Sequence, residues 1–264
     1  MKATFLFFGP DQASSRFRAM IPWLQLQKYG VKPGKDILIA SKHGYSWDIT
    51  EGYKKIIFDI CDDHFNDKWG THYRRGCEIA DAIICNSEAM QLIIKEETGR
   101  DAFIIEDPYE DDEHEPAFGD SLLWFGHSTN FPDLARVIPT LDRDVELQIV
   151  SNIEGATQWT PQSMDLALKK CGMVIIPTGK SMAKSANRMI KALRYGRFVV
   201  AEPLPAHNEI EGPWLGTISK GIKWAIDNPQ SVLDRIRQGQ DSIRERFSPE
   251  TIGKKWLEVL SSLT

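Results

Sequence analysis

The chain has 264 residues, and at roughly 150 residues per domain this length predicts two domains. Its hydrophobic (42%) and charged (26%) fractions are ordinary for a globular protein and exclude a disordered, collagen-like or disulfide-scaffold chain. The formal net charge of −5 gives no general attraction for nucleic acid or an anionic membrane. Nucleic acid is therefore not the expected partner, although composition alone does not exclude it.

The apolar stretches and the cysteines indicate in which cellular compartment the protein is expected. No apolar stretch approaches the ~20 residues that a membrane-spanning helix needs, and the first residues do not resemble a secretion signal. The four cysteines have neither CxxC spacing nor a histidine at the spacing of a zinc site. We therefore expect a cytoplasmic protein with reduced thiols, no integral membrane span and no metal site.

The charges are distributed unevenly. Residues 1–120 carry 14 basic and 22 acidic side chains, whereas residues 121–264 carry 18 and 15. Most of the acidic excess lies in residues 106–116, EDPYEDDEHEP, which repel one another and predict an interdomain linker that packs no core. Residues 166–201, in contrast, contain no acidic residue and eight basic ones. We therefore expect this segment to attract an anionic group that lies outside it.

Short apolar runs alternate with helical patterns along the chain, which predicts an α/β fold with parallel sheets. Helix signals include Ser87 as N-cap before a helix that ends at Gly99, and Ser248 with Pro249 at the start of a last helix. A helix over 184–195 has one apolar and one basic face. The predicted strands cover residues 3–8, 36–41, 55–59, 82–86, 102–105, 121–125, 145–150, 172–177 and 197–201.

Three segments were compared with the patterns of known phosphate-binding loops, and two of them have the composition of anion sites. The loop after the first strand has only Gly9 where a dinucleotide fingerprint needs three glycines, which argues against nicotinamide chemistry. Ser14, Ser15 and Arg16 at its helix start are either an N-cap with a solvated arginine or an anion site. Gly179-Lys180-Ser181 lacks the first glycine of a P-loop. Residues 184–188, KSANR, offer helix N–H donors and two cations, as a diphosphate site would, although a solvated basic face explains them equally well.

Three aspartates and two histidines follow predicted strands. Asp59, Asp62 and Asp63 stand at the carboxyl end of a buried strand, where α/β enzymes place functional groups. Such carboxylates orient hydroxyls, act as bases or cap turns. His43 and His127 also follow strands, where a histidine is more often an ordinary loop residue than a catalytic one.

Together these segments resemble the GT-B glycosyltransferases, in particular the family-4-like group also called glycosyl transferases group 1. The resemblance covers most of the chain and rests on the order of its motifs. They are SSRFR at 14–18, KIIFDICDD at 55–63, ADAIICNSE at 80–88, LWFGH at 123–127 with Asn130, KSANR at 184–188, ALRYGRFVVA at 192–201 and the final segment 248–256.

The resemblance implies two Rossmann-like α/β domains whose parallel sheets face each other across a cleft. Residues 1–117, completed by a helix over 248–264, would bind the acceptor, and residues 118–247 would bind the nucleotide-sugar donor. The implied reaction moves a sugar from a nucleotide-diphosphate sugar, a co-substrate rather than a cofactor, to a hydroxyl of a glycan, glycolipid or other compound. No metal ion is expected, because a helix N-terminus and cations stabilise the leaving diphosphate.

Site residues follow from the motifs and from the chemistry they need. Asp62, Asp63 and His127 are expected to orient sugar or acceptor and form the catalytic set. Ser14, Ser15, Arg16 and Arg18 form a loop near donor or acceptor. The donor and its diphosphate are expected at Gly126, Asn130, Lys184, Ser185, Asn187, Arg188 and Lys191.

One departure from the family pattern opens two alternatives. Retaining members carry two glutamates separated by seven residues, and the matching positions here are Ala183 and Lys191. The first alternative is a catalytically silent module of the same fold that binds a nucleotide or glycan. The second is a sugar transferase acting on modified nucleic acid, which the compact size and the basic segment suggest.

Overall fold

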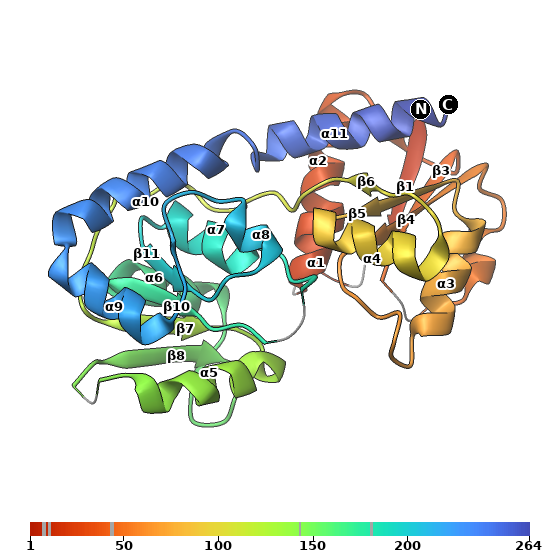
Figure 1. Cartoon of the computed structure of the whole chain (residues 1–264). Coiled ribbons are helices and arrows are strands. Elements are labelled where there is room, and N and C mark those ends of the chain that lie inside the picture. The colour runs from red at the N-terminus through yellow and green to blue at the C-terminus, as the bar shows by residue number, and fades with distance from the viewer. Residues whose placement is uncertain (7–8, 10–11, 43–44, 143, 180–181) are drawn as a thin grey trace. The chain divides into compact units, whose positions relative to one another are not determined.

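The computed structural model describes residues 1–264 except 7–8, 10–11, 43–44, 143 and 180–181. Its contacts divide the chain into two units (Figure 1). The N-terminal unit comprises Met1–Glu110 and Glu245–Thr264, and the C-terminal unit comprises Asp111–Arg244. The sequence placed these divisions near 117 and 247, several residues later along the chain.

The N-terminal unit contains a six-stranded parallel sheet of order β2-β1-β3-β4-β5-β6. Every residue of the two strands β3 and β5 is buried, as expected for strands covered on both faces. The strands are β1 (Lys2–Leu6), β2 (Lys32–Pro33), β3 (Ile37–Ser41), β4 (Lys55–Ile60), β5 (Ala82–Cys85) and β6 (Phe103–Ile104).

Helices cover this first sheet. The first of them is continuous but contains a π-helical turn, Arg16–Met20, between α1 (Ala13–Ser15) and α2 (Ile21–Lys28). The last helix, α11 (Pro249–Ser262), packs against α2, where a Cβ added at Gly253 would lie 2.4 Å from the Gln25 side chain. The others are the 3₁₀ turn Trp47–Thr50, α3 (Gly70–Ile79) and α4 (Glu88–Thr98).

The C-terminal unit contains a second six-stranded parallel sheet, of order β12-β11-β10-β7-β8-β9. Its strands are β7 (Leu122–Phe125), β8 (Leu147–Ser151), β9 (Thr157–Gln158), β10 (Met173–Ile176), β11 (Phe198–Ala201) and β12 (Trp214–Leu215). Its helices are α5 (Phe131–Val137), α6 (Pro161–Lys170), α7 (Asn187–Arg194), α8 (Pro205–Asn208), α9 (Ile218–Asp227) and α10 (Pro229–Arg244), with 3₁₀ turns at Ser128–Asn130 and Ile138–Thr140.

The predicted α/β class with two parallel sheets is confirmed, and each predicted strand overlaps an observed one. The sequence missed β2, β9 and β12 because two residues are too few to show a periodic pattern. Ser87 and Ser248 cap α4 and α11 through their hydroxyls, as predicted. The predicted helix 184–195 begins later, at Asn187.

The acidic segment 106–116 was predicted to pack no core, and this is wrong. Its first part belongs to the N-terminal unit, where Glu106 and Asp107 are buried. Glu106 accepts hydrogen bonds from Lys255 at 2.6 Å and Arg246 at 3.2 Å. Opposite charges that follow 140 or more residues later make this burial tolerable, and no local pattern shows them.

The rest of the acidic segment belongs to the C-terminal unit and supplies the anions that the basic segment lacks. Lys191 donates to both carboxylate oxygens of Asp111 at 2.7 Å. Arg194 lies 2.6 Å and Arg244 lies 2.7 Å from the Glu113 carboxylate. Three cations of α7 and α10 are therefore neutralised within the unit.

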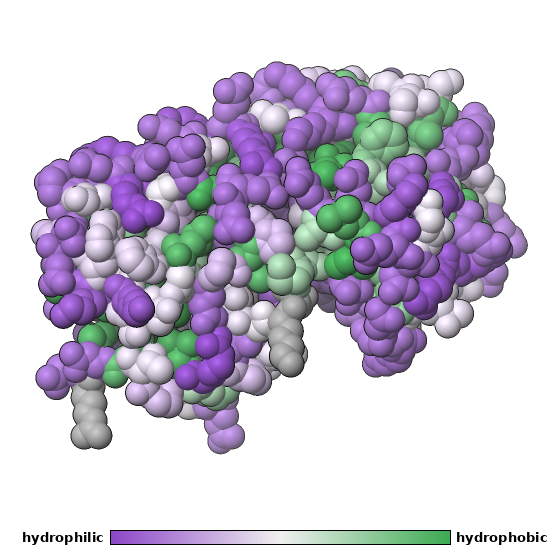
Figure 2. All heavy atoms as spheres, in the orientation of Figure 1, coloured by the Kyte–Doolittle hydropathy of each residue, from purple (hydrophilic) through white to green (hydrophobic). Residues whose placement is uncertain are grey.

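The face of the molecule drawn in Figure 2 is mainly hydrophilic. On the face drawn in Figure 2, apolar residues appear as separate groups among charged and polar ones. Within the described part of the chain, no helix combines the length and the apolar character needed to cross a membrane.

Candidate functional site

Ligands of parallel α/β sheets bind beyond the carboxyl ends of the strands. In the C-terminal unit, the residues that follow β7, β10 and β11 lie at this edge. They include Gly126 after β7 and residues 177–179 and 182–186 between β10 and α7. The candidate donor site is built from these segments and from the first turns of α5 and α7.

Arg188, the second residue of α7, is the central cation of this edge. Its Nη1 atom is buried and has no hydrogen-bond partner among the described residues. A Cβ added at Gly126 would lie 3.6 Å from this Nη1 and 3.1 Å from the Trp124 ring. The glycine therefore leaves the space beside the guanidinium open, where any other residue would begin to fill it.

Burial works against the charge of Arg188. It lowers the pKa of the guanidinium to about 10, although the nearby Asp133 carboxylate opposes the shift. The group is still a cation at neutral pH. A buried charge with an unsatisfied hydrogen-bond donor is costly, and a bound anion would relieve that cost.

Lys184 is the second cation of the edge. It lies just before α7, and its Nζ donates to Asn130 Oδ1 at 2.9 Å and lies 3.4 Å from Asp133 Oδ2. The N-cap residue of α7, Ala186, has no side-chain oxygen that could cap the first turn of the helix. The helix start and the two cations of the predicted segment KSANR therefore lie together, and the diphosphate site stays a prediction.

His127 follows Gly126 and joins a hydrogen-bond network with Thr129 and Asn152. Asn152 Oδ1 accepts from Ser128 N at 2.8 Å, which assigns the orientation of the amide. Asn152 Nδ2 must then donate, and it lies 3.2 Å from His127 Nε2. Nδ1 of the ring accepts from Thr129 N at 3.3 Å and lies 3.1 Å from Thr129 Oγ1, so both ring nitrogens have polar neighbours, and the His127 side chain is exposed.

Two residues after β11 extend this site and were missed by the sequence analysis. Glu202 accepts from Thr178 N at 2.8 Å and pairs with Arg136 at 2.5 Å. His207 is buried and donates from Nδ1 to the Glu202 carbonyl at 2.9 Å. Burial lowers the pKa of His207, and the charge of Arg188 adds to this shift. The missed signal was the acidic Glu202 directly after a buried strand.

In the N-terminal unit, the structure gives the three clustered aspartates different roles. Asp59 is fully buried and accepts from Arg18 Nε at 3.1 Å and from Ser41 Oγ at 3.0 Å. Asp63 Oδ1 accepts from Phe65 N at 3.1 Å, as a turn former does. Asp62 pairs with Lys42 at 2.9 Å and keeps half of its side chain exposed.

Asp62 and Asp63 are thus exposed, and Asp62 is the one of the two that pairs with a lysine. Burial favours its neutral form, but Lys42 outweighs burial and lowers the pKa of Asp62. Lys42 itself has a φ of 62°, a left-handed conformation that costs energy for a residue with a Cβ and is common at functional sites. Nearby, Asn86 donates to the Cys61 carbonyl at 3.2 Å, while its buried Oδ1 has no partner in the described part.

The predicted loop 14–18 is mostly occupied by internal contacts. Arg18 is buried and donates to Asp59, Asp107 and the Ile105 carbonyl. Arg16 pairs with Glu110 at 2.7 Å. Ser15 is buried and Ser14 partly so.

The remaining predicted residues flank the start of α7. Ser185 precedes the helix and Asn187 is its first residue. Lys191 lies one turn further on and is engaged by Asp111. His43 lies outside the described residues.

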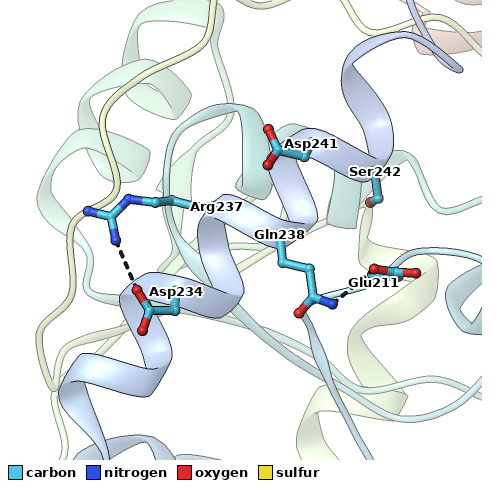
Figure 3. Close-up of a pocket in the computed structure, with 6 residues that line it drawn as sticks. All are labelled: Glu211, Asp234, Arg237, Gln238, Asp241 and Ser242. Atoms are coloured by element: carbon cyan, nitrogen blue, oxygen red, sulfur yellow. Dashed lines mark hydrogen bonds and ion pairs between the residues drawn. The ribbon is translucent and has the colours of Figure 1, made fainter.

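A hollow of about 590 Å³ lies along α10 in the C-terminal unit, and Figure 3 shows the side chains that line it. Its charged groups already have partners, because Arg237 pairs with Asp234 at 3.1 Å and Gln238 donates to Glu211 at 2.9 Å. We assign it no function. No cluster of three or more metal-ligating side chains occurs among the residues that the structure describes.

No family model and no curated protein matches the chain. Solved structures do match. HepE of Anabaena in complex with UDP superposes with a TM-score of 0.66 at 14% identity, over 92% of this chain and 82% of HepE. The chain has the GT-B fold.

Two further structures with the GT-B fold match over a similar extent. Sucrose-phosphate synthase of Thermosynechococcus elongatus gives a TM-score of 0.67 at 11% identity, over 98% of this chain and 81% of that one. TarM gives 0.64 at 19% identity and covers 91% of this chain, which spans 57% of TarM. At these identities the similarity concerns the fold.

Proposed function

We propose that the protein is a glycosyltransferase that moves a hexose or pentose from a nucleotide-diphosphate sugar to an acceptor hydroxyl, without a metal ion. The proposal rests on one observation above all, the buried and unpartnered Nη1 of Arg188 at the carboxyl edge of the second sheet. The GT-B fold supports it, because HepE of the same fold holds UDP in its crystal structure. The expected cytoplasmic location stays a prediction.

The proposed chemistry assigns the cations to the leaving group. The bond between the anomeric carbon and the terminal phosphate oxygen breaks while the acceptor oxygen bonds to that carbon. Negative charge then develops on the departing diphosphate, and Arg188, Lys184 and the N-terminus of α7 stabilise it. Gly126 admits the phosphate to Arg188, and Asn130 holds Lys184 in place.

The acceptor side of the proposal uses the N-terminal unit. Asp62 would orient the acceptor hydroxyl and take its proton, since its pairing with Lys42 keeps it a carboxylate at neutral pH. His127 would contact the sugar or phosphate through its exposed imidazole, and Asp63 supports the turn that presents Asp62. The acceptor is a hydroxyl of a glycan, glycolipid or other compound.

The first experiment measures donor binding. Thermal unfolding and calorimetry would compare UDP, GDP and ADP and their glucose conjugates on the wild-type protein and on Lys184→Met with Arg188→Met. Methionine keeps the volume of each side chain and removes its charge. We expect the double variant to lose at least a hundredfold in affinity, because both charged donors to the diphosphate are gone.

The matched control is Lys170→Met, which removes an exposed cation at the end of α6. Its affinity should equal that of the wild type. Unchanged nucleotide affinity in the double variant would contradict the donor site. Retained activity after chelation of divalent ions is expected, and activity restored only by added Mg²⁺ or Mn²⁺ would contradict metal independence.

A silent nucleotide- or glycan-binding module is the second candidate. The observation that favours it is the place of the family's second glutamate, where Lys191 stands and is bound by Asp111. Binding without sugar transfer or donor hydrolysis, across a broad acceptor panel, would favour this module over the enzyme. Salt-sensitive binding to DNA would instead point to a nucleic-acid acceptor.

A further inference from the structure

The donor site contains a carboxylate that a diphosphate site does not need. Asp133, in the first turn of α5, lies 3.4 Å from Lys184 Nζ, and its charge also acts on Arg188. A Cβ added at Gly179 would lie 2.7 Å from Asp133 Oδ1, so the carboxylate lies against the loop that follows β10. It therefore stands at the carboxyl edge of the sheet, among the groups that would bind phosphate.

We propose that Asp133 makes this site discriminate against the extra negative charge of a free nucleoside diphosphate, relative to its sugar conjugate. The inference rests on the proposed function. In the conjugate both phosphates are esterified and carry one charge each. The terminal phosphate of the free nucleoside diphosphate carries no sugar, and it gains a second charge above a pH of about 6. A fixed carboxylate beside the binding cations penalises that additional charge.

Such discrimination is useful because the two ligands are donor and product. Without it, the product of transfer would bind more tightly than the donor, since Lys184 and Arg188 attract its additional charge. Asp133 offsets part of that attraction and favours exchange of product for fresh donor. Asn130, which also accepts from Lys184, holds the ammonium without adding a negative charge.

The charged groups around Asp133 come from three places. Lys184 approaches from the segment before α7, and Arg188 from α7 itself. Arg136 is on its own helix and is paired with Glu202 after β11, and Asp133 helps to raise the pKa of Arg136. Arg136 is already neutralised by Glu202, so the charge of Asp133 acts mainly on the two cations of the site.

A simpler explanation makes Asp133 a favourable charge at the start of α5, where the helix dipole stabilises carboxylates. That role predicts a loss of stability in Asp133→Asn but no change in ligand preference. The two explanations therefore differ in a binding measurement.

The test compares the wild type with Asp133→Asn and Asp133→Glu by calorimetry, at pH 5.5 and pH 7.5. The ligands are UDP, GDP and ADP, each with its glucose conjugate, and the pair that binds the wild type best is used. Asparagine keeps the shape and an acceptor for Lys184 while removing the charge. At pH 7.5 we expect Asp133→Asn to increase the affinity for the nucleoside diphosphate about tenfold and the affinity for its glucose conjugate about threefold.

The pH dependence separates charge from structure. At pH 5.5, where the terminal phosphate has lost its second charge, the variant should tighten both ligands by the same factor. Asp133→Glu restores the charge and should restore the wild-type preference. The control Asp120→Asn removes an exposed charge before β7, at the opposite edge of the same sheet, and should change neither affinity.

The possible results separate a failure of the proposed role of Asp133 from a failure of the proposed donor site. An equal change for both ligands at pH 7.5, or weaker binding of both, overturns the role of Asp133 while the donor site stands. A wild type that binds none of the six ligands overturns the proposed function and this inference with it.

Discussion

An arginine lies at the carboxyl edge of each sheet, Arg18 buried and Arg188 partly buried, and the two differ in their counterions. In the N-terminal unit, Arg18 donates to the carboxylates of Asp59 and Asp107 and to a backbone carbonyl. In the C-terminal unit, Arg188 keeps a buried Nη1 without a partner among the described residues. One guanidinium is fully satisfied by the protein, and the other still has a donor to offer.

The pKa shifts of the two arginines have opposite signs for this reason. Burial disfavours both charges. Around Arg18 the two carboxylates outweigh burial and raise its pKa. Among the described residues, Asp133 alone supports the charge of Arg188, and the pKa of Arg188 falls to about 10. Burial alone therefore does not distinguish a charged side chain that stabilises the fold from one that binds a ligand. The number of hydrogen-bond and ion-pair partners within the protein does distinguish them.

The largest expected effect is on the stability of the N-terminal unit. Arg18→Met leaves Asp59 and Asp107 buried without their counterion, and breaking such a group costs about 3–5 kcal/mol. Urea unfolding should show this loss. A loss below about 1 kcal/mol would mean that the ion group around Arg18 is not what holds α1 and α2 to the sheet.

Arg188→Met should give the reverse result. It removes a buried charge whose Nη1 has no described partner, so we expect the free energy of unfolding to stay within about 1 kcal/mol of the wild type. Nucleoside diphosphate affinity should fall at least tenfold, because a charged donor is lost. Calorimetry and urea unfolding on the same preparation would check both. A variant that is destabilised like Arg18→Met would show that Arg188 is structural as well.

Gly126→Ala tests the space beside Arg188 without changing its charge. The new methyl group would lie 3.1 Å from Trp124 and 3.6 Å from Arg188 Nη1. We expect about a tenfold loss of nucleotide affinity, at a cost in stability of no more than about 1–2 kcal/mol for the tight contact. The control is Gly119→Ala, whose methyl would lie 3.6 Å from its nearest neighbour, before β7 at the other edge. Equal affinity in both variants would remove Gly126 from the site.

The sequence predicted what local patterns determine. Apolar runs identified the strands, and the caps at Ser87 and Ser248 fixed two helix starts because a serine hydroxyl bonds an N–H three residues later. The basic residues at the start of α7 were also recognised, because they immediately precede or begin an amphipathic helical pattern. These features depend on neighbours within a few residues.

Pairings between distant residues were not predictable. Asp111 and Lys191 are 80 residues apart, and Arg18 and Asp107 are 89 apart. No period connects such positions, so the sequence did not show that the acidic segment packs against other parts of the chain, or that Arg18 is buried in an ion-pair network. Asp133 was missed because an acid in the first turn of a helix is ordinary, and only its distance to Lys184 sets it apart.

The smallest expected effect concerns the ion pair of Asp62 and Lys42. The pKa of Asp62 is lowered in the folded state, so the unfolded state binds its proton more readily as pH falls. The pair therefore stabilises the fold above a pH of about 4, and this contribution disappears as pH falls through the lowered pKa.

Asp62→Asn should then lose less than about 1 kcal/mol at pH 7, because half of the Asp62 side chain is exposed, and should match the wild type near pH 3. Urea unfolding at the two pH values measures this. The control Asp63→Asn keeps an acceptor for Phe65 N and should follow the wild type at both. If the Asp62→Asn difference persists at pH 3, the charge is not its source, and the comparison of charged groups at the two sheet edges would rest on the arginines alone.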